Sequence, residues 1–300
     1  MRAWALALGL MASPAFAQEL PVKLADGATW TMSVQRDRER IQDGKAPQKS
    51  HTESTSTLTW KQGGQLSVQP QSAKALGPGS EEINAQALLK LPVLLTVDEA
   101  LTPTSIVNWT QVRQGLDELI DGSVSDPKVA AATKGAFTNL SPDVAAQVLM
   151  REVVLTSLGQ GTALRLGQDV PYADNLPNPL GGPPIKAAGR FRLETYDARA
   201  GRALVTWTSA FDQASASESL RQSMNAMAQR VAPDNADEAR KFFEGAKIDR
   251  QDTCRHQIDI PTGLAMKVEC SSTIIITAQG RTGQNVDRWT ITQSLPKTTP

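Results

Sequence analysis

This 300-residue chain has two cysteines and two histidines, the residue types best suited to redox, acid–base or metal chemistry. Cys254 and Cys270 enclose alternating apolar and polar residues on both sides of a Pro-Thr-Gly turn, and His256 lies on the apolar side. Such alternation around a turn predicts two antiparallel strands, each with one buried face. Folding the segment at Thr262 sets three pairs of residues opposite each other: Cys254 and Cys270, Arg255 and Glu269, and Ile258 and Met266.

The two cysteines predict one structural disulfide. Two cysteines allow a single intramolecular pairing, and a redox centre would favour a Cys-x-x-Cys spacing, which this sequence lacks. Closing a loop of this length is worth about 3 kcal/mol in the chain-entropy model. We therefore expect Cys254–Cys270 to brace the hairpin rather than to react.

The histidines and carboxylates form no recognised catalytic or metal-binding pattern. His51 lies in a Ser- and Thr-rich segment, and the lone inward His256 is interpreted as a core residue. The sequence has no His-Glu-x-x-His, Gly-x-Ser-x-Gly or Walker motif. Adjacent acids such as Asp98-Glu99 point to different sides of an element, so they are poor candidates for a shared acid/base site. We therefore expect no metal and no other cofactor.

The N-terminus has the three parts of a secretory signal peptide. Arg2 precedes an apolar run, and Ala15-Phe16-Ala17 is a small-x-small cleavage site. We expect residues 1–17 to be removed on export to the periplasm, whose oxidising conditions permit a disulfide. No later segment approaches the roughly 18 to 20 apolar residues that a membrane span requires. Without Arg2 the chain has 30 basic residues against 31 acidic ones, which gives no electrostatic reason to expect nucleic acid as a partner.

The rest of the chain separates into blocks of strands and helices. Strands are predicted across residues 28–108, helices across 109–158, and both kinds of element across 186–294. The Pro- and Gly-rich stretch 168–184 is interpreted as an irregular loop, either a linker or the rim of one domain. Segregated blocks favour the α+β class. We therefore expect residues 18–300 to form a single α+β domain around a large antiparallel, strongly curved sheet, an open half-barrel.

Three helices are predicted in the central block. Asn108, Asp126 and Ser141 precede their first turns, and Gln111 completes a capping box with Asn108. The third helix is expected to continue without a break to Leu158, where glycines end it.

This element order resembles that of the periplasmic lipoprotein carriers of the LolA and LolB type. The resemblance covers most of Thr29 to Gln293 in element order, with no motif shared residue by residue. It implies helices packed on the concave face of the sheet and, where they fill it incompletely, an apolar groove for a lipid or acyl chain. Candidates for lining that groove are inward-facing residues of the helices and of the disulfide hairpin: Trp109, Leu116, Met224, Met227, His256 and Met266.

These observations predict an exported, non-enzymatic periplasmic protein that binds an apolar ligand or an envelope protein partner. One alternative is an envelope glycan hydrolase whose carboxylates are distant in sequence. Another is a structural accessory module that engages an edge strand or loop of another protein. An apolar cavity between sheet and helices would favour the carrier, a cleft with two converging carboxylates the hydrolase, and a solid core the accessory module.

Overall fold

A computed structural model describes residues 17–76, 91–138, 140–176, 178, 183–231 and 245–295. Residues 1–16, which hold all but the last residue of the predicted signal peptide, lie outside these ranges. Most described strands belong to one 11-stranded sheet in which every neighbouring pair is antiparallel. The large antiparallel sheet predicted from the sequence is therefore confirmed.

The strands of the large sheet are, in chain order, β2 (Thr29–Gln42), β3 (Gln48–Lys61), β4 (Gln65–Leu76), β5 (Val93–Val97), β6 (Pro103–Ile106), β8 (Asp169–Leu176), β9 (Ile185–Asp197), β10 (Arg202–Phe211), β11 (Lys247–Asp259), β12 (Ala265–Ala278) and β13 (Arg281–Ser294). The helices are α2 (Trp109–Ser123), α3 (Pro127–Thr138), α4 (Pro142–Leu149), α5 (Arg151–Ser157) and α6 (Gln213–Val231). A small second sheet pairs β1 (Gln18–Glu19) with β7 (Ala163–Leu164).

The sheet consists of two meanders joined at its centre. Its order is β6-β5-β4-β3-β2-β13-β12-β11-β10-β9-β8, so each meander runs through neighbours in the sequence and only β2 and β13 pair across a long separation. This pairing places β6 and β8 at opposite edges of an open sheet. The chain between β6 and β8 must cross from one edge to the other, and it does so through α2 to α5.

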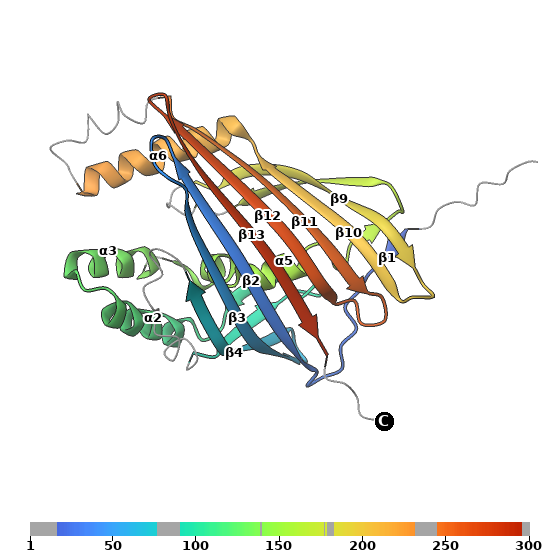
Figure 1. Ribbon diagram of the computed structural model, residues 1–300. Helices are drawn as coiled ribbons and strands as arrows, with labels where there is room; N and C mark the ends of the chain where they lie inside the picture. Colours follow the sequence, from blue (N-terminus) through green and yellow to red (C-terminus); the bar gives the residue numbers. More distant parts are fainter. Residues whose placement is uncertain are drawn as a thin grey trace, which may run out of the picture.

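The helices lie on one side of the sheet (Figure 1). We call this side the inner face; it carries the side chains of Trp30, His256 and Ile291. The carbonyl oxygen of Leu155 in α5 hydrogen-bonds to the ring of His256 on β11. α6 covers a smaller apolar cluster at the other end of the same strands, in which Ala216 packs against side chains of β9 and β10.

The apolar core follows from the period-2 pattern of the strands. In β2 the buried residues are Trp30, Met32 and Val34, which alternate with more exposed polar residues. The same alternation in the other strands fills one continuous core between the sheet, α4 and α5. Because alternate side chains of a strand point to the same side, each strand continues to present inner-face residues beyond the end of this core.

The predicted disulfide hairpin is confirmed with one change in register. Cys254 is bonded to Cys270, and Arg255 lies opposite Glu269. The predicted pairing of Ile258 with Met266 is wrong, because a β-bulge beside the turn places Ile258 opposite Ala265. A bulge adds one residue to one strand, so period-2 counting from the turn fails there.

The prediction of an irregular loop across 168–184 is wrong in its first half. Residues Asp169–Leu176 form β8, which pairs with β9. Pro171 and the following prolines predicted a loop. Proline has no backbone N–H, and an edge strand tolerates it because one side of that strand forms no hydrogen bonds to a neighbouring strand. β8 occupies such an edge. Of the rest of the stretch, residues 177 and 179–182 lie outside the described ranges.

Two details of the helical block also differ from expectation. The predicted third helix is two helices, because α4 ends at Leu149 and α5 begins at Arg151. The break is at Met150, whose backbone leaves the helical region (φ −102°, ψ 34°) and which caps both helices. The predicted capping box is absent: the side chain of Asn108 instead accepts a hydrogen bond from the Leu94 amide and donates one to the Pro92 carbonyl, each at 2.9 Å. Asn108 therefore ties α2 to the start of β5.

Gly189 on β9 provides a test of the strand packing. A Cβ at this position would clash with the backbone carbonyl oxygen of Thr208 and lie 2.8 Å from Cε1 of Tyr172, whereas a Cβ at Gly283 on β13 would meet nothing within 4 Å. We expect Gly189→Ala to lower the free energy of unfolding by about 1 to 3 kcal/mol, because the obstructing atom is backbone. Gly283→Ala should change it by less than about 0.5 kcal/mol. Urea denaturation measures both, and equal effects of the two substitutions would contradict the packing.

Candidate functional site

The inner face changes from apolar to polar along the strands. On the apolar side of the disulfide, β11 presents His256 and Ile258, which are buried under α5 and its neighbours. On the other side the same strand presents Asp252 and Arg250. We call the region of the inner face beyond the disulfide the polar half.

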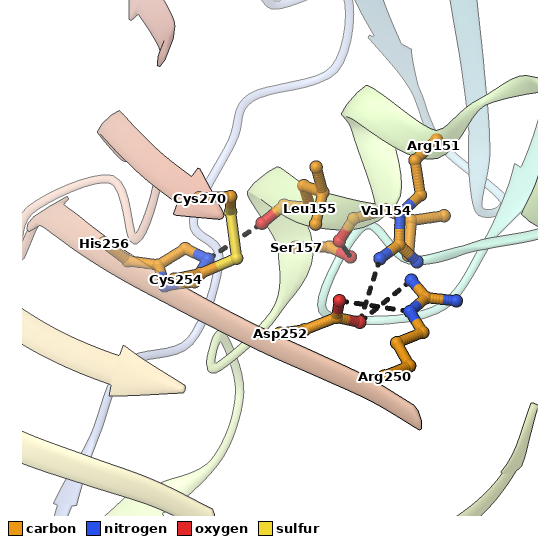
Figure 2. Close-up of a disulfide and its surroundings, with 9 residues drawn as sticks. All are labelled: Arg151, Val154, Leu155, Ser157, Arg250, Asp252, Cys254, His256 and Cys270. Carbon is orange, nitrogen blue, oxygen red and sulfur yellow. Dashed lines mark hydrogen bonds and ion pairs between the residues drawn. A yellow bond between two sulfur atoms is a disulfide. The ribbon is translucent and has the colours of Figure 1, made fainter. Parts of the chain in front are cut away.

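His256 is a core residue, as the sequence predicted. Its side chain is fully buried, and Nε2 lies 2.8 Å from the Leu155 carbonyl oxygen, so Nε2 carries the proton and donates it (Figure 2). Burial lowers the pKa of the ring to about 4, outweighing the hydrogen bond to the carbonyl, which favours the charged form. The imidazole is therefore neutral near pH 7 and serves to hold α5 on the sheet.

Asp252 begins the polar half and binds two arginines. Its side chain is only 3% exposed. Arg250 from the same strand contacts both carboxylate oxygens, with Nε at 3.1 Å and Nη2 at 2.9 Å, and Arg151 from α5 approaches Oδ2 at 3.5 Å (Figure 2). One buried carboxylate thus joins β11 to α5, and the group of three side chains carries one net positive charge.

Asp287 on β13 forms a second group of the same composition. Nε of Arg36 and Nε of Arg38, both on β2, each lie 2.9 Å from Oδ1 of Asp287. The guanidinium of Arg36 also stacks 5.0 Å from the centre of the Trp289 ring, a cation–π arrangement. The side chain of Arg38 is 51% exposed, against 13% for Asp287. The Asp287 group is therefore open to solvent on the side of Arg38.

A pocket of about 590 Å³ lies beside the Asp287 group. This volume is within the range of small-molecule sites. The residues that line it come from four strands, β2, β3, β12 and β13: Arg38, Arg40, Gln48, Lys49, Ser50, Ile274, Asn285 and Asp287. Its lining is mostly polar, and guanidinium, amide and hydroxyl donors predominate over the one carboxylate.

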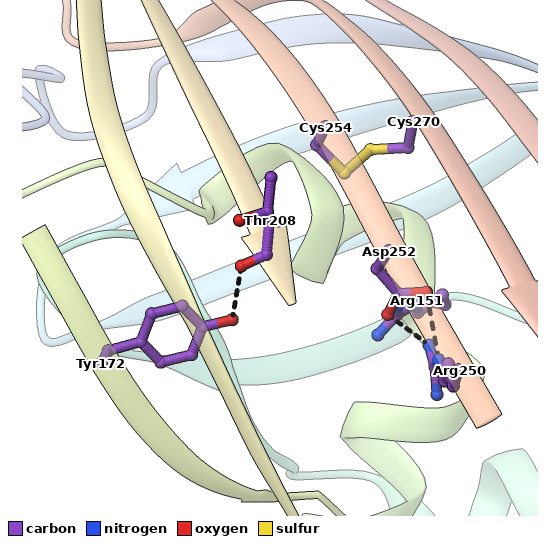
Figure 3. Close-up of polar contacts among 7 residues, drawn as sticks. All are labelled: Arg151, Tyr172, Thr208, Arg250, Asp252, Cys254 and Cys270. Atoms are coloured by element: carbon purple, nitrogen blue, oxygen red, sulfur yellow. Dashed lines mark hydrogen bonds and ion pairs between the residues drawn. A yellow bond between two sulfur atoms is a disulfide. The ribbon is translucent and has the colours of Figure 1, made fainter. Parts of the chain in front are cut away.

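Aromatic side chains lie between β8 and β10 at the boundary between the apolar core and the polar half, with Trp207 opposite Cys254. The ring of Tyr172 is 5.1 Å from that of Phe191 and 6.5 Å from that of Trp207. The Tyr172 hydroxyl donates a long hydrogen bond of 3.5 Å to the Thr208 carbonyl, and burial is the main reason that its pKa is raised (Figure 3). These rings pack together across β8, β9 and β10, next to the strand that bears Asp252.

Of the sequence-predicted lining residues, the five whose side chains the structure describes do not line this pocket. Trp109 is buried in the core, and Leu116 and Met266 pack against the same core. Met224 is half-buried on α6, and the side chain of Met227 lies outside what the structure describes. A lipid groove formed by these residues therefore stays a prediction.

The arginines of β2 are site residues that were not predicted, although their spacing in the sequence carries a signal. Arg36, Arg38 and Arg40 continue the alternation begun by Trp30 and Val34, so period 2 alone assigns all of them to the inner face. These arginines occupy the alternate positions that carry apolar residues earlier in the strand. Charged residues at such positions indicate either an ion-pair partner or a binding site, because burying an unpaired charge costs free energy.

His51 lies on the opposite, outer face of the sheet. Its Nδ1 is 2.8 Å from Asp37 and its Nε2 is 3.2 Å from Glu53. These two hydrogen bonds, to Asp37 first, raise the pKa of the ring above its usual value. In the part of the chain that the structure describes, no group of three or more His, Cys, Asp or Glu side chains is arranged to hold a metal ion. No described helix has the length and apolar character needed to cross a bilayer.

Comparison with known proteins gives no family for this chain. No family model matches it, and no curated protein matches it. Among solved structures, lipovitellin, studied for its lipid–protein interactions, is 10% identical over 93% of this chain with a TM-score of 0.49. This chain spans 26% of that protein's chain.

Two bacterial structures are less similar. DynF from the dynemicin biosynthesis pathway of Micromonospora chersina is 7% identical, with a TM-score of 0.23 over 100% of this chain and 95% of its own. The attachment invasion protein Ail of Yersinia pestis is 4% identical, with a TM-score of 0.18 over 90% of this chain and 100% of its own. Because all three TM-scores are below 0.5, we infer neither function nor ligand from these proteins. The resemblance to the lipoprotein carriers stays an expectation from element order.

The two histidines predict opposite pH effects on stability. Because the pKa of His256 is about 4 in the folded chain and about 6.5 when unfolded, the unfolded state alone takes up a proton between these values, and stability falls as the pH decreases from 6.5 to 4. The loss is of the order of 3 kcal/mol. His51 has a raised pKa, so its contribution is complete below 6.5 and is lost only at higher pH.

We therefore expect His256→Gln to lose less unfolding free energy than the wild type when the pH is lowered from 6.5 to 4. The matched variant His51→Gln should lose nearly as much as the wild type over that interval, since below about pH 6 His51 is mostly protonated in both states. Urea denaturation at a series of pH values measures this difference. A wild-type pH dependence in His256→Gln would show that His256 is not the buried neutral group described.

Proposed function

We propose that this protein is an exported, non-enzymatic binding protein whose ligand occupies the polar half of the inner face and has an apolar part. In this proposal residues 18–300 act as one domain, an open half-barrel whose helices lie on the concave face of the sheet. The observation that carries the proposal is the pocket of about 590 Å³ on the inner face beside the Asp287 group. Helices fill the apolar half of that face and leave this pocket beside it.

The apolar part of the ligand is supported by the isoleucines of β11 and β12. Ile274 lines the pocket. Ile276 follows it on the same face of β12, directly opposite Ile248 of β11. All three are only partly buried. A hydrocarbon chain on this strip would remove them from water, and a favourable free energy of about 25 cal/mol per Å² of apolar surface would result.

The glycan hydrolase receives less support from the geometry. A glycosidase places two carboxyl groups on either side of the scissile bond, whereas the described lining of the pocket includes one, Asp287. Asp287 is bound by two arginines, and so is the nearby buried Asp252. Both carboxylates are therefore already occupied by guanidinium groups of the protein itself. A protein partner in the envelope is an outcome that the following experiment can reveal.

Native mass spectrometry of the purified exported protein tests the proposal. We expect a bound organic molecule, or uptake of an added dodecyl-chain amphiphile at one molecule per chain. Ile274→Ser should weaken that binding by about fivefold, a loss of about 1 kcal/mol from partial burial of one side chain. Ile275→Ser is the matched control, because Ile275 is the next residue of the same strand and points to the outer face.

Two results would contradict the proposal. One is a chain that carries nothing and takes up no amphiphile, which would favour the accessory module. The other is an equal effect of Ile274→Ser and Ile275→Ser on binding, which would place the ligand elsewhere on the molecule.

A further inference from the structure

The polar half carries a surplus of fixed positive charge. Asp252 and Asp287 are each bound by two arginines, so each group of three keeps one net positive charge. Arg40 adds a third: within the described ranges it makes no ion pair, although it lines the same pocket as Asp287. The whole chain, by contrast, has equal numbers of basic and acidic residues, so this surplus is local.

The two arginine groups lie close together on the inner face, because Asp252 of β11 and Asp287 of β13 are both paired in register with Ser272 of the intervening strand β12. Burial is the main cause that lowers the pKa of Arg151, and repulsion by Arg250 and by Arg36 adds to it. Arg36 belongs to the Asp287 group, so the two groups act on each other across the inner face. Gathering like charges in a partly buried place costs free energy. Such an arrangement is typical of a site whose ligand supplies the missing negative charge.

The neutral side chains around the pocket are suited to an oxyanion. Gln48 and Asn285 offer amide N–H donors, and Ser50 offers a hydroxyl, beside the guanidinium groups of Arg38 and Arg40. The one acidic side chain of the lining, Asp287, is already engaged by arginines. An anion entering here would meet donors on several sides and no unpaired carboxylate among the lining residues.

We infer that the polar half binds a phosphate group, held by the guanidinium groups of Arg38 and Arg40. Guanidinium groups bind phosphate through paired, charge-assisted hydrogen bonds. A phosphate monoester carries about 1.5 to 2 negative charges at pH 7, which matches three surplus positive charges better than a single carboxylate does. The inference rests on the proposed function only in taking this pocket as the ligand site. The phosphate is either free or the headgroup of an amphiphile, and in the second case its chain would lie toward Ile274.

Isothermal titration calorimetry with three probes separates these cases. The probes are inorganic phosphate, dodecyl phosphate below its micelle concentration, and a neutral dodecyl glycoside. The diagnostic variant is Arg40→Gln, because Arg40 is exposed and its removal breaks no ion pair with any residue that the structure describes. The control is Arg288→Gln, an exposed arginine on the opposite face of neighbouring β13. Circular dichroism and thermal unfolding check that both variants fold.

We expect dodecyl phosphate to bind more tightly than either other probe. Arg40→Gln should weaken it by about tenfold or more, as expected when one hydrogen-bonded charge is lost, and Arg288→Gln should leave it unchanged. Arg40→Lys should recover only part of the loss, because an ammonium group keeps the charge and lacks the planar fork. Binding should also weaken as the salt concentration rises, since Arg40 is exposed to screening.

The remaining outcomes distinguish this inference from the proposed function. Equal affinity for inorganic and dodecyl phosphate, with loss in Arg40→Gln, would support a free phosphate site and remove the apolar part of the proposed ligand. Equal affinity for dodecyl phosphate and the neutral glycoside, unchanged in Arg40→Gln, would overturn the phosphate site and leave the proposed function standing. Failure of all three probes to bind would overturn both.

Discussion

The pairing of β2 with β13 is the constraint on which the rest of the structure depends. It joins two meanders, each of which pairs only neighbours in the sequence, into one sheet with β6 and β8 at its far edges. The chain that connects those edges has to cross a face of the sheet, and burial of the apolar residues on one face decides which face it crosses. The hydrogen bond between the Leu155 carbonyl and His256 fixes α5 in that crossing.

The length of the strands then creates the candidate site. β2, β12 and β13 each have 14 residues and β11 has 13, so they extend well past the core that α4 and α5 cover. Beyond the disulfide, β2 and β13 present mainly charged and amide side chains on the inner face, and β11 and β12 add the isoleucines Ile248, Ile274 and Ile276. Arg151 at the start of α5 meets Asp252 at this boundary, so one buried ion pair both attaches the helix and begins the charged surface. Arg151 and Asp252 thus attach the helix to the sheet and also stand at the edge of the polar half.

The sequence predicted the parts that depend on local periodicity. Alternation around the Pro-Thr-Gly turn gave the pairing of Cys254 with Cys270, and the inward position of His256 followed from the same count. Counting alternate residues from the turn gave the wrong partner for Ile258. A β-bulge there adds one residue to one strand, and the local sequence does not indicate it. The sequence predicts a loop at 169–176 because Pro171 disfavours a strand in the middle of a sheet. This strand tolerates Pro171 because it lies at the edge, and its place at the edge depends on the β2–β13 pairing.

The sequence alone could not predict which residues meet in the candidate site, for a related reason. Its residues come from β2, β3, β12 and β13, and β2 and β13 lie at opposite ends of the sequence, so only the tertiary structure brings Asp287 to Arg36. Methyl-selective NMR of isoleucine, recorded while dodecyl phosphate is added, is the most direct test of the claim that the ligand lies in this pocket. The account predicts the largest shift change at Ile274, with Ile275 on the outer face and Ile291 in the core unaffected. Shift changes centred on Ile291, or no change at Ile274 on saturation, would contradict it.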